Sequence, residues 1–298
     1  MENGGSELMN VLVLGAGYSG TAIAKALAPS AQSVTGTTRS PDKLAALSSA
    51  GITPILFDGN AISAELAEAM QKTTHLIQSI APGQEGDPMF RATRPPLDEL
   101  LPKLQWGGYL STVGVYGDHG GAWVAEDAPI RPVSQRSKER VEAENAWLDF
   151  GARQGIPVAV LRLAGIYGPG RNAFRNLAAG TAHRIIKPNQ VFNRIRVEDI
   201  GAATALLAAR GLSGIYNITD DEPAPPQDVV AEAARLMGVE PPQEVPFETA
   251  ELSPMARSFY GENKRVSNAR LREAGYELAF PNYRASLAQL WASGTWPG

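Results

Sequence analysis

The sequence contains no cysteine and only three histidines in 298 residues. The absence of cysteine excludes disulfides, thiolate zinc sites and cysteine nucleophiles, and it is typical of proteins in a reducing cytoplasm, where we expect this chain. His75, His119 and His183 lie far apart in the sequence, and we therefore predict no bound metal.

An excess of basic charge and a long apolar run are also missing. The formal net charge is −4, and charged residues make up 19% of the chain against 44% hydrophobic residues. This balance predicts an ordinary globular protein with no nucleic-acid or membrane-surface partner. No apolar run reaches the length of a membrane span. Residues 1–9 are predicted to be a loose polar leader without a secretion-signal pattern.

The most informative segment is Val11–Gly20, in which a short apolar run meets three glycines at GxGxxG spacing before a helix-forming sequence. A strand, a glycine turn and a helix in this order form the pyrophosphate site of dinucleotide-binding folds. Gly15 would permit the tight turn, Gly17 would let the backbone approach the phosphates, and Gly20 would let the helix pack on the strand. We assign Tyr18 and Ser19, within the loop, to the same site.

Strands and helices alternate after this loop. Strands are predicted at 33–39, 54–57, 75–80, 108–112 and 158–162, and helices at 41–44 onward, 64–70, within 90–105 and at 134–154. This alternation predicts an α/β fold of the Rossmann type, with a doubly wound parallel sheet.

The alternation breaks down after Ala164, where helices are predicted near 197–210, 226–237 and 284–292 and a strand at 214–218. We predict a cofactor-binding domain over 9–165, to which 190–220 returns. Residues 166–189 and 221–298 are predicted to form a small C-terminal substrate-binding subdomain.

The cofactor is predicted from the end of the second strand, where an acid would select NAD by binding its ribose hydroxyls. Thr37, Thr38 and Arg39 stand there instead, and two hydroxyls beside a guanidinium suit the 2′-phosphate of NADP(H). NADP(H) is therefore favoured over NAD(H), although Arg39 can also be a solvated side chain. Asp58 is a candidate contact for the adenine or a cap of the turn at Gly59, and Ser79 is assigned to the cofactor site as well.

Five further segments occur in the order found in a known family. They are Ser111–Gly117, Pro132–Lys138 with Glu142, Arg162–Gly170, Asn193–Ile200 and Tyr216–Asp220. Together with the glycine loop they make the chain resemble the extended and atypical short-chain dehydrogenase/reductases of the NAD-dependent epimerase/dehydratase type. The resemblance implies a Rossmann-type NAD(P) domain, a small substrate-binding part, and hydride transfer at a carbinol carbon.

The chain departs from this family at its catalytic helix. Members use a Tyr-x-x-x-Lys pair, in which tyrosine moves the hydroxyl proton and lysine lowers its pKa and holds the nicotinamide ribose. Ser134 occupies the position four residues before Lys138, and its hydroxyl is a much weaker acid than the phenol of a tyrosine. Tyr116 or Lys138 could move the proton instead, Thr112 could polarise the substrate oxygen with a water completing the relay, or the site could bind cofactor without turnover.

Thr112 is preferred over Ser111 as the ligand of the substrate oxygen, because it precedes Tyr116 by the family's offset. Either hydroxyl can instead bond to backbone at a strand end. Tyr116 is expected to line the site or to pack. Lys138 is expected to contact the cofactor ribose, with a solvated helix lysine as the alternative.

Substrate candidates follow the fifth strand and lie in the later segments. His119 could serve as acid or base, and Arg171, Arg194, Arg196 and Arg257 would suit an anionic or nucleotide-sugar substrate if they converged.

We therefore expect an NADP(H)-dependent oxidoreductase or epimerase acting on a hydroxyl or keto group of a sugar-like or other polar small molecule. The alternatives are a non-catalytic NADP(H)-binding sensor or interaction protein, and a cofactor-assisted dehydration with Glu126 as a weak candidate acid or base. Either a monomer or a homodimer is compatible with the sequence.

Overall fold

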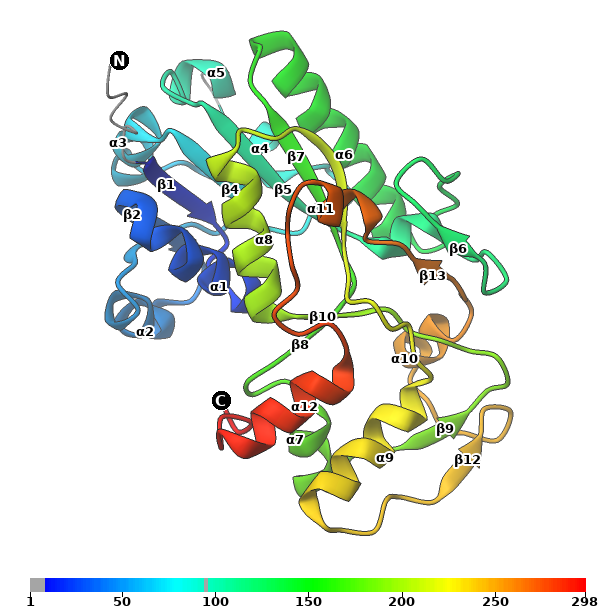
Figure 1. Ribbon diagram of the computed structural model, residues 1–298. Coiled ribbons are helices and arrows are strands. Elements are labelled where there is room, and N and C mark those ends of the chain that lie inside the picture. The colour runs from blue at the N-terminus through cyan, green and yellow to red at the C-terminus, as the bar shows by residue number, and fades with distance from the viewer. Residues whose placement is uncertain (1–8, 94–95) are drawn as a thin grey trace. The chain divides into compact units, whose positions relative to one another are not determined.

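The computed structural model describes residues 9–93 and 96–298. Residues 1–8 of the predicted leader, and Pro95, lie outside the described ranges, while Met9 already begins the first strand. Figure 1 shows the arrangement of the helices and strands.

The central feature is a seven-stranded parallel sheet with the order β11-β7-β5-β4-β1-β2-β3. The direction of winding reverses between β1 and β4, where ligands bind in open sheets of this type. The strands are β1 (Met9–Leu14), β2 (Ala31–Thr38), β3 (Thr53–Leu56), β4 (His75–Gln78), β5 (Trp106–Thr112), β7 (Val158–Leu163) and β11 (Gly214–Ile218). The predicted Rossmann-type fold class is confirmed.

Alternation along β1 shows why helices cover both sheet faces. Leu12 and Leu14 belong to a core completed by side chains of the helices between later strands. Val13 points the other way, and the space beside it is closed by the helix that starts at Tyr18. The helices of this part are α1 (Tyr18–Leu27), α2 (Leu44–Ser49), α3 (Ala64–Lys72), α4 (Pro88–Ala92), α5 (Leu97–Leu100), α6 (Gln135–Gln154) and α8 (Val197–Ala209).

One predicted helix is replaced by two short ones. The helix expected within 90–105 is observed as α4 and α5, and Pro96 immediately precedes α5. Proline lacks the backbone donor of a continuing helix, and Pro96 is the N-cap of α5 with a ψ of 154°, so one helix does not run through it. Pro41 likewise begins a 3₁₀ turn, η2 (Pro41–Lys43), ahead of α2.

The remaining elements include two helices close to those predicted at 226–237 and 284–292, together with several short ones that the sequence pattern did not indicate. Three-residue strands are too short to produce a recognisable alternation. The elements are η1 (Ala28–Ser30), η3 (Val113–Tyr116), β6 (Trp123–Val124), β8 (Gly165–Tyr167), α7 (Ala173–Ala178), β9 (Arg184–Ile186), β10 (Arg194–Arg196), α9 (Pro226–Met237), β12 (Glu244–Pro246), α10 (Pro254–Phe259), β13 (Arg265–Val266), α11 (Ala269–Glu273) and α12 (Tyr283–Ala292).

The chain forms two compact units. The first holds the described residues up to 112 together with 134–162 and 200–215, and the second holds 113–133, 163–199 and 216–298. Segment 113–133, assigned from the sequence to the cofactor-binding part, belongs to the second unit, where β6 pairs with β13. Within 9–93 and 96–298, none of the helices combines the length and the apolar character needed to cross a bilayer.

Candidate functional site

The glycine loop joins β1 to α1 in the first unit. Gly15 has a φ of +86°, and a Cβ there would lie 2.9 Å from the Cγ1 atom of Ile80. A Cβ on Gly20 would lie 2.5 Å from the carbonyl oxygen of Gly15, so the helix packs on the strand at a distance that only glycine permits. The turn and the close packing predicted for these two glycines are thus present.

Gly17 differs from the other two glycines because a Cβ on it would meet nothing within 4 Å. It is exposed and is the N-cap of α1, which begins with neither a side-chain cap nor an acid in its first turn. The partial positive charge of the helix N-terminus is therefore not neutralised by the helix itself. This arrangement suits the approach of a pyrophosphate to the backbone.

The loop is held from β2 and β4. The Thr37 hydroxyl accepts a hydrogen bond from the Gly15 N–H at 2.8 Å, and the Thr37 carbonyl accepts one from Ala16 at 2.7 Å. The Ser79 N–H, just past β4, donates to the Leu14 carbonyl at 2.9 Å. Thr37 and Ser79 therefore lie beside the glycine loop, and the Thr37 hydroxyl already supports it.

The remaining cofactor candidates lie at the ends of β2 and β3. The Thr38 hydroxyl accepts from the Ser40 N–H at 3.2 Å, whereas the exposed Arg39 guanidinium has no hydrogen bond or ion pair in the described ranges. Asp58 accepts from the Asn60 N–H at 2.9 Å and from its side-chain amide at 3.0 Å. These bonds lower the pKa of the Asp58 carboxyl, and they match the turn-capping alternative.

Ser111 takes part in a buried polar network at the end of β5. Its hydroxyl donates to Glu144 of α6 at 2.5 Å, and Arg162 of β7 donates to both oxygens of the same carboxylate at 3.1 and 2.7 Å. Ser111, Glu144 and Arg162 are all buried. The Ser111 hydroxyl is therefore committed to Glu144, which agrees with the preference for Thr112 as the substrate-oxygen ligand.

The neighbouring helix α6 has two distinct faces. Ser137, Glu144 and Trp147 are buried, whereas Lys138 is exposed. Arg140, one turn before Glu144, donates to the Leu110 carbonyl of β5. Lys138 has no hydrogen bond or ion pair within the described part of the chain, and Thr112 is half-buried at the end of β5.

Ser134 lies outside the helix on which the tyrosine was expected. It is the N-cap of α6, and its hydroxyl accepts from the Ser137 N–H at 3.1 Å. The Oγ atom of Ser134 also lies 2.9 Å from the Oγ atom of Ser137, within hydrogen-bonding distance. These bonds explain the serine as a helix cap.

In the second unit, Tyr116 is fully buried and its hydroxyl donates to the Asn217 side-chain oxygen at 2.7 Å. The Nε2 atom of His119 lies 3.1 Å from the Tyr116 carbonyl and 3.2 Å from the Pro129 carbonyl. Tyr116 therefore has the packing role that was the alternative to a catalytic one. His119 is half-buried, and its side chain contacts backbone carbonyls of the segment to which it belongs.

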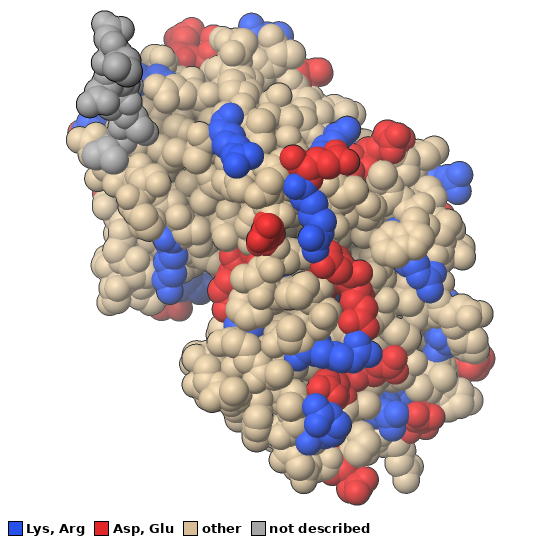
Figure 2. Space-filling view, in the orientation of Figure 1, with Lys and Arg blue, Asp and Glu red and all other residues tan. Residues whose placement is uncertain are grey.

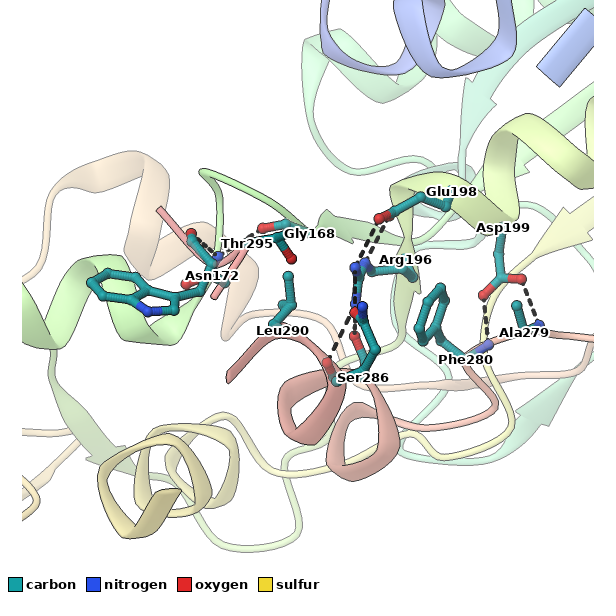
Figure 3. A network of polar contacts seen from close by, with 12 residues as sticks. Gly168, Asn172, Arg196, Glu198, Asp199, Ala279, Phe280, Ser286, Leu290 and Thr295 are labelled. Carbon is teal, nitrogen blue, oxygen red and sulfur yellow. Dashed lines mark hydrogen bonds and ion pairs between the residues drawn. The ribbon is translucent and has the colours of Figure 1, made fainter. Parts of the chain in front are cut away.

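The arginines proposed for the substrate are mostly engaged inside the second unit. Arg196 binds both oxygens of Glu198 at 2.7 Å and also donates to Ser286 and to Gln289 (Figure 3). All five of its N–H groups are thereby accounted for, because its Nη1 also reaches the Ser286 carbonyl at 3.3 Å. Arg196 is 1% exposed and is therefore a structural residue here.

Two of the other arginines are also bound to backbone. Arg194 donates to the carbonyls of Phe192 and Ala224 at 2.9 Å, and Arg257 donates to the Ala250 carbonyl at 2.7 Å. Arg171 is exposed. The structure thus gives Arg194, Arg196 and Arg257 separate internal partners.

Glu144 and Arg140 were not predicted from the sequence, because neither belongs to a recognised motif. A possible signal was the four-residue spacing between them, which places both on one helix face.

Comparisons with known proteins agree with this architecture. No protein-family model matches the chain. Protein YeeZ of Escherichia coli is 32% identical over 292 residues, which cover 92% of this chain and 97% of YeeZ. A 3-diazoavenalumate denitrifying reductase of a Streptomyces species is 30% identical over 145 residues, 44% of this chain and 46% of that protein.

Solved structures share the fold over nearly the whole chain. A conserved protein of unknown function from Silicibacter pomeroyi has a TM-score of 0.85 at 46% identity, covering 95% of this chain and 98% of that one. The human epimerase family protein SDR39U1 with NADPH has a TM-score of 0.71 at 20% identity, covering 95% and 99%. The dTDP-glucose 4,6-dehydratase of Bacillus anthracis with NAD has a TM-score of 0.73 at 17% identity, covering 96% and 97%. The chain therefore belongs to the family of protein YeeZ and has the fold of the extended short-chain dehydrogenase/reductases, the NAD-dependent epimerase/dehydratase type that its motifs resemble.

Proposed function

We propose that the chain binds NADP(H) with its pyrophosphate at the N-terminus of α1 and acts as an oxidoreductase or epimerase. The observation that carries this proposal is the geometry of the glycine loop. Gly15 and Gly20 have no room for a Cβ, while Gly17 faces open space at an uncapped helix N-terminus. Backbone donors and a helix dipole directed at one open position are what a bound pyrophosphate requires.

The preference for NADP(H) rests on the end of β2. Arg39 is exposed and unpaired within the described ranges, so its guanidinium is available to a 2′-phosphate. No acid stands at residues 37–39 to bind the ribose hydroxyls of NAD. Among the structures of similar fold, the human protein carries NADPH and the Bacillus anthracis enzyme carries NAD, so the preference rests on Arg39.

The proposed chemistry acts on a hydroxyl or keto group of a sugar-like or other polar small molecule, for which the bound nicotinamide would supply or accept hydride. In this proposal Thr112, half-buried at the end of β5, orients the substrate oxygen, and the exposed Lys138 contacts the cofactor ribose. The partial similarity to a Streptomyces reductase supports a redox role. Of the four arginines proposed for an anionic substrate, Arg171 and Arg257 are exposed, and Arg257 donates to the Ala250 carbonyl.

A second candidate function is a non-catalytic NADP(H)-binding sensor. It is favoured because two hydroxyls that were candidates for moving the proton form hydrogen bonds within the protein. The Ser134 hydroxyl caps α6, and the buried Tyr116 hydroxyl is bonded to Asn217. Cofactor binding is common to both candidates, and turnover separates them.

Cofactor binding is tested by titrating the protein with NADPH and with NADH. We expect NADPH to bind more tightly and Arg39→Ala to remove most of that difference. Arg153, exposed near the end of α6 and also unpaired in the described ranges, provides the matched control as Arg153→Ala. Equal affinities in the native protein would contradict the preference, and no binding of either nucleotide would contradict the proposed function.

Turnover is tested by following NADPH absorbance with sugar nucleotides, sugar phosphates and small ketones. We expect turnover of at least one compound that is lost in Thr112→Ala and Lys138→Ala. Nucleotide binding without turnover of the panel would favour the sensor. Turnover that both substitutions leave unchanged would place the reaction elsewhere.

Acidic and basic side chains are intermingled on the face drawn in Figure 2, so this face shows no continuous basic patch of the kind that binds nucleic acid. A small-molecule substrate, with no nucleic-acid or membrane partner, stays a prediction. A cytoplasmic location and a monomeric or homodimeric state stay predictions.

A further inference from the structure

The second unit contains a buried polar cluster that includes none of the residues proposed for the cofactor. It comprises Tyr167 at the end of β8, Arg194 at the start of β10, and Asp220, which follows β11. In the parallel pair β8–β10, Tyr167 lies opposite Arg196, so Tyr167, Arg194 and Arg196 share one face of the pair. The Asp220 N–H donates to the Arg194 carbonyl at 2.7 Å, which holds Asp220 beside the start of β10, and the Asp220 carboxyl acts on the pKa of both Arg194 and Tyr167.

Two oxygens of this cluster lack partners. Tyr167 Oη and Asp220 Oδ2 each expose less than 1 Å², and neither has a partner at hydrogen-bonding geometry among the described residues. Burial raises the pKa of Tyr167, and the nearby Ser286 hydroxyl, which already accepts from Arg196 Nη1 at 2.9 Å, opposes that rise. Asp220 itself is 1% exposed, and its other oxygen accepts from the Glu222 N–H at 3.2 Å. Buried polar atoms are nearly always paired, either with protein or with ordered water, so two orphaned oxygens in one cluster indicate a missing partner.

The three groups share one electrostatic environment. Burial lowers the pKa of the Arg194 guanidinium. Among the nearby groups that raise this pKa, Asp220 has the largest effect and Tyr167 the next. Burial also raises the pKa of the Asp220 carboxyl to about 8, against the influence of Arg194. Asp220 is therefore largely protonated at neutral pH, and its free oxygen can donate a hydrogen bond.

We propose that Tyr167 Oη and Asp220 Oδ2 bind one internal water molecule, beside the guanidinium of Arg194. A water both donates and accepts, so it pairs with Asp220 in either protonation state. It would link β8 to the turn after β11, which are distant in the sequence and have no direct side-chain bond at these atoms. Neither oxygen belongs to the residues assigned to the cofactor.

Other occupants fit the cluster less well. An anion would face the charges of Asp221 and Glu222, which also act on Asp220, with Arg194 as the nearest opposing charge. The other two arginines nearby are already paired, Arg272 with Asp221 and Arg284 with Glu222. A metal cation would find one carboxylate next to a guanidinium. A larger molecule has no open path to oxygens that expose less than 1 Å².

A crystal structure at a resolution that resolves ordered water tests the proposal directly. We expect an isolated density peak about 2.6–3.2 Å from both Tyr167 Oη and Asp220 Oδ2. A direct bond between the two side chains, an empty gap, or a peak that identifies as an ion would overturn it.

A double-mutant cycle provides a second measurement. Tyr167→Phe and Asp220→Ala each remove one partner of the water. If the water is shared, the double variant shifts the thermal midpoint by less than the sum of the single shifts. Tyr276→Phe is the matched control, because Tyr276 donates directly to Asp199 at 2.6 Å and has no part in the cluster. Its combination with Asp220→Ala should be additive. Additivity in the Tyr167 cycle would overturn the shared water.

Discussion

The Cβ position of Gly20 lies 2.5 Å from the carbonyl oxygen of Gly15, across the turn that joins β1 to α1. This approach lets the helix begin directly above the strand, and it leaves Gly17 at the open end of the helix. The same loop therefore contains two glycines that packing requires, Gly15 and Gly20, and one that packing does not require, Gly17. Gly20 and Gly17 can be tested separately.

Gly20→Ala should destabilise the protein by about 1–3 kcal/mol, because the added methyl group overlaps backbone that cannot move freely. Urea unfolding measures this change. A free energy of unfolding equal to that of the native protein would mean that the loop relaxes more easily than its geometry indicates.

Gly17→Ala should leave the free energy of unfolding within about 1 kcal/mol of the native value, because φ is −82° and the methyl group meets no atom within 4 Å. It should weaken NADPH binding at least about tenfold, since the methyl group would project where we propose that the phosphates approach the backbone. Titration of the folded variant provides the measurement. Unchanged affinity would place the pyrophosphate away from Gly17.

Glu144→Ala should destabilise the first unit strongly, by about 3–5 kcal/mol, because it leaves the buried Arg162 charge without its partner. Ser111→Ala removes one hydrogen bond to Glu144 and keeps the ion pair, so a smaller loss of about 1.5–3 kcal/mol is expected. Chemical denaturation gives both values. The exposed Glu142 on the same helix supplies the control, and Glu142→Ala should change little. Equal losses for Glu144→Ala and Glu142→Ala would contradict the network.

Ser134→Ala should cost about 1 kcal/mol of stability, whereas Ser134→Asp should retain the native value, because aspartate also accepts from the first-turn N–H groups. Thermal unfolding separates the two variants. Alanine has no group that could carry a proton to substrate, so any turnover found for the native protein should survive Ser134→Ala. Loss of turnover in a folded Ser134→Ala protein would return Ser134 to the list of catalytic residues.

Asp220 should make stability depend on pH. Its folded pKa of about 8 lies above the ordinary value of 3.8, so the native state binds more protons than the unfolded state between these values. The contribution of Asp220 is thus complete below about pH 4 and falls as the pH rises toward 8, by at most about 1.4 kcal/mol per pH unit. Arg194 opposes this shift, while Asp221 and Glu222 add to it.

Asp220→Asn mimics the protonated carboxyl and should remove this slope. The stability of the variant relative to the native protein should therefore increase from pH 4 to pH 8. Unfolding curves of both proteins across that range provide the comparison, and other titrating groups cancel in the difference. A constant difference would show that Asp220 is ionised in the folded state.

Local sequence determined the framework of the protein. The glycine loop, the strand and helix alternation of the first unit, and the long helix after Ser134 were predictable, because the required signals lie within a few residues of one another. Each of these signals determines the backbone conformation of nearby residues only, as a turn glycine, an N-cap serine and an apolar alternation do. The short strands β8, β9, β10 and β12 were not predictable, since three residues carry too little pattern.

The tertiary structure determined which partners the polar side chains bind. The sequence gives no sign that Ser111 would bind Glu144, that Tyr116 would bind Asn217, or that Arg196 would be enclosed by Glu198 and α12 (Figure 3). Except for Glu198, these partners lie from 33 to 101 positions away in the chain. A hydroxyl or guanidinium can donate to a substrate or to an acceptor inside the protein. Only the fold determines which acceptors lie within hydrogen-bonding distance of it.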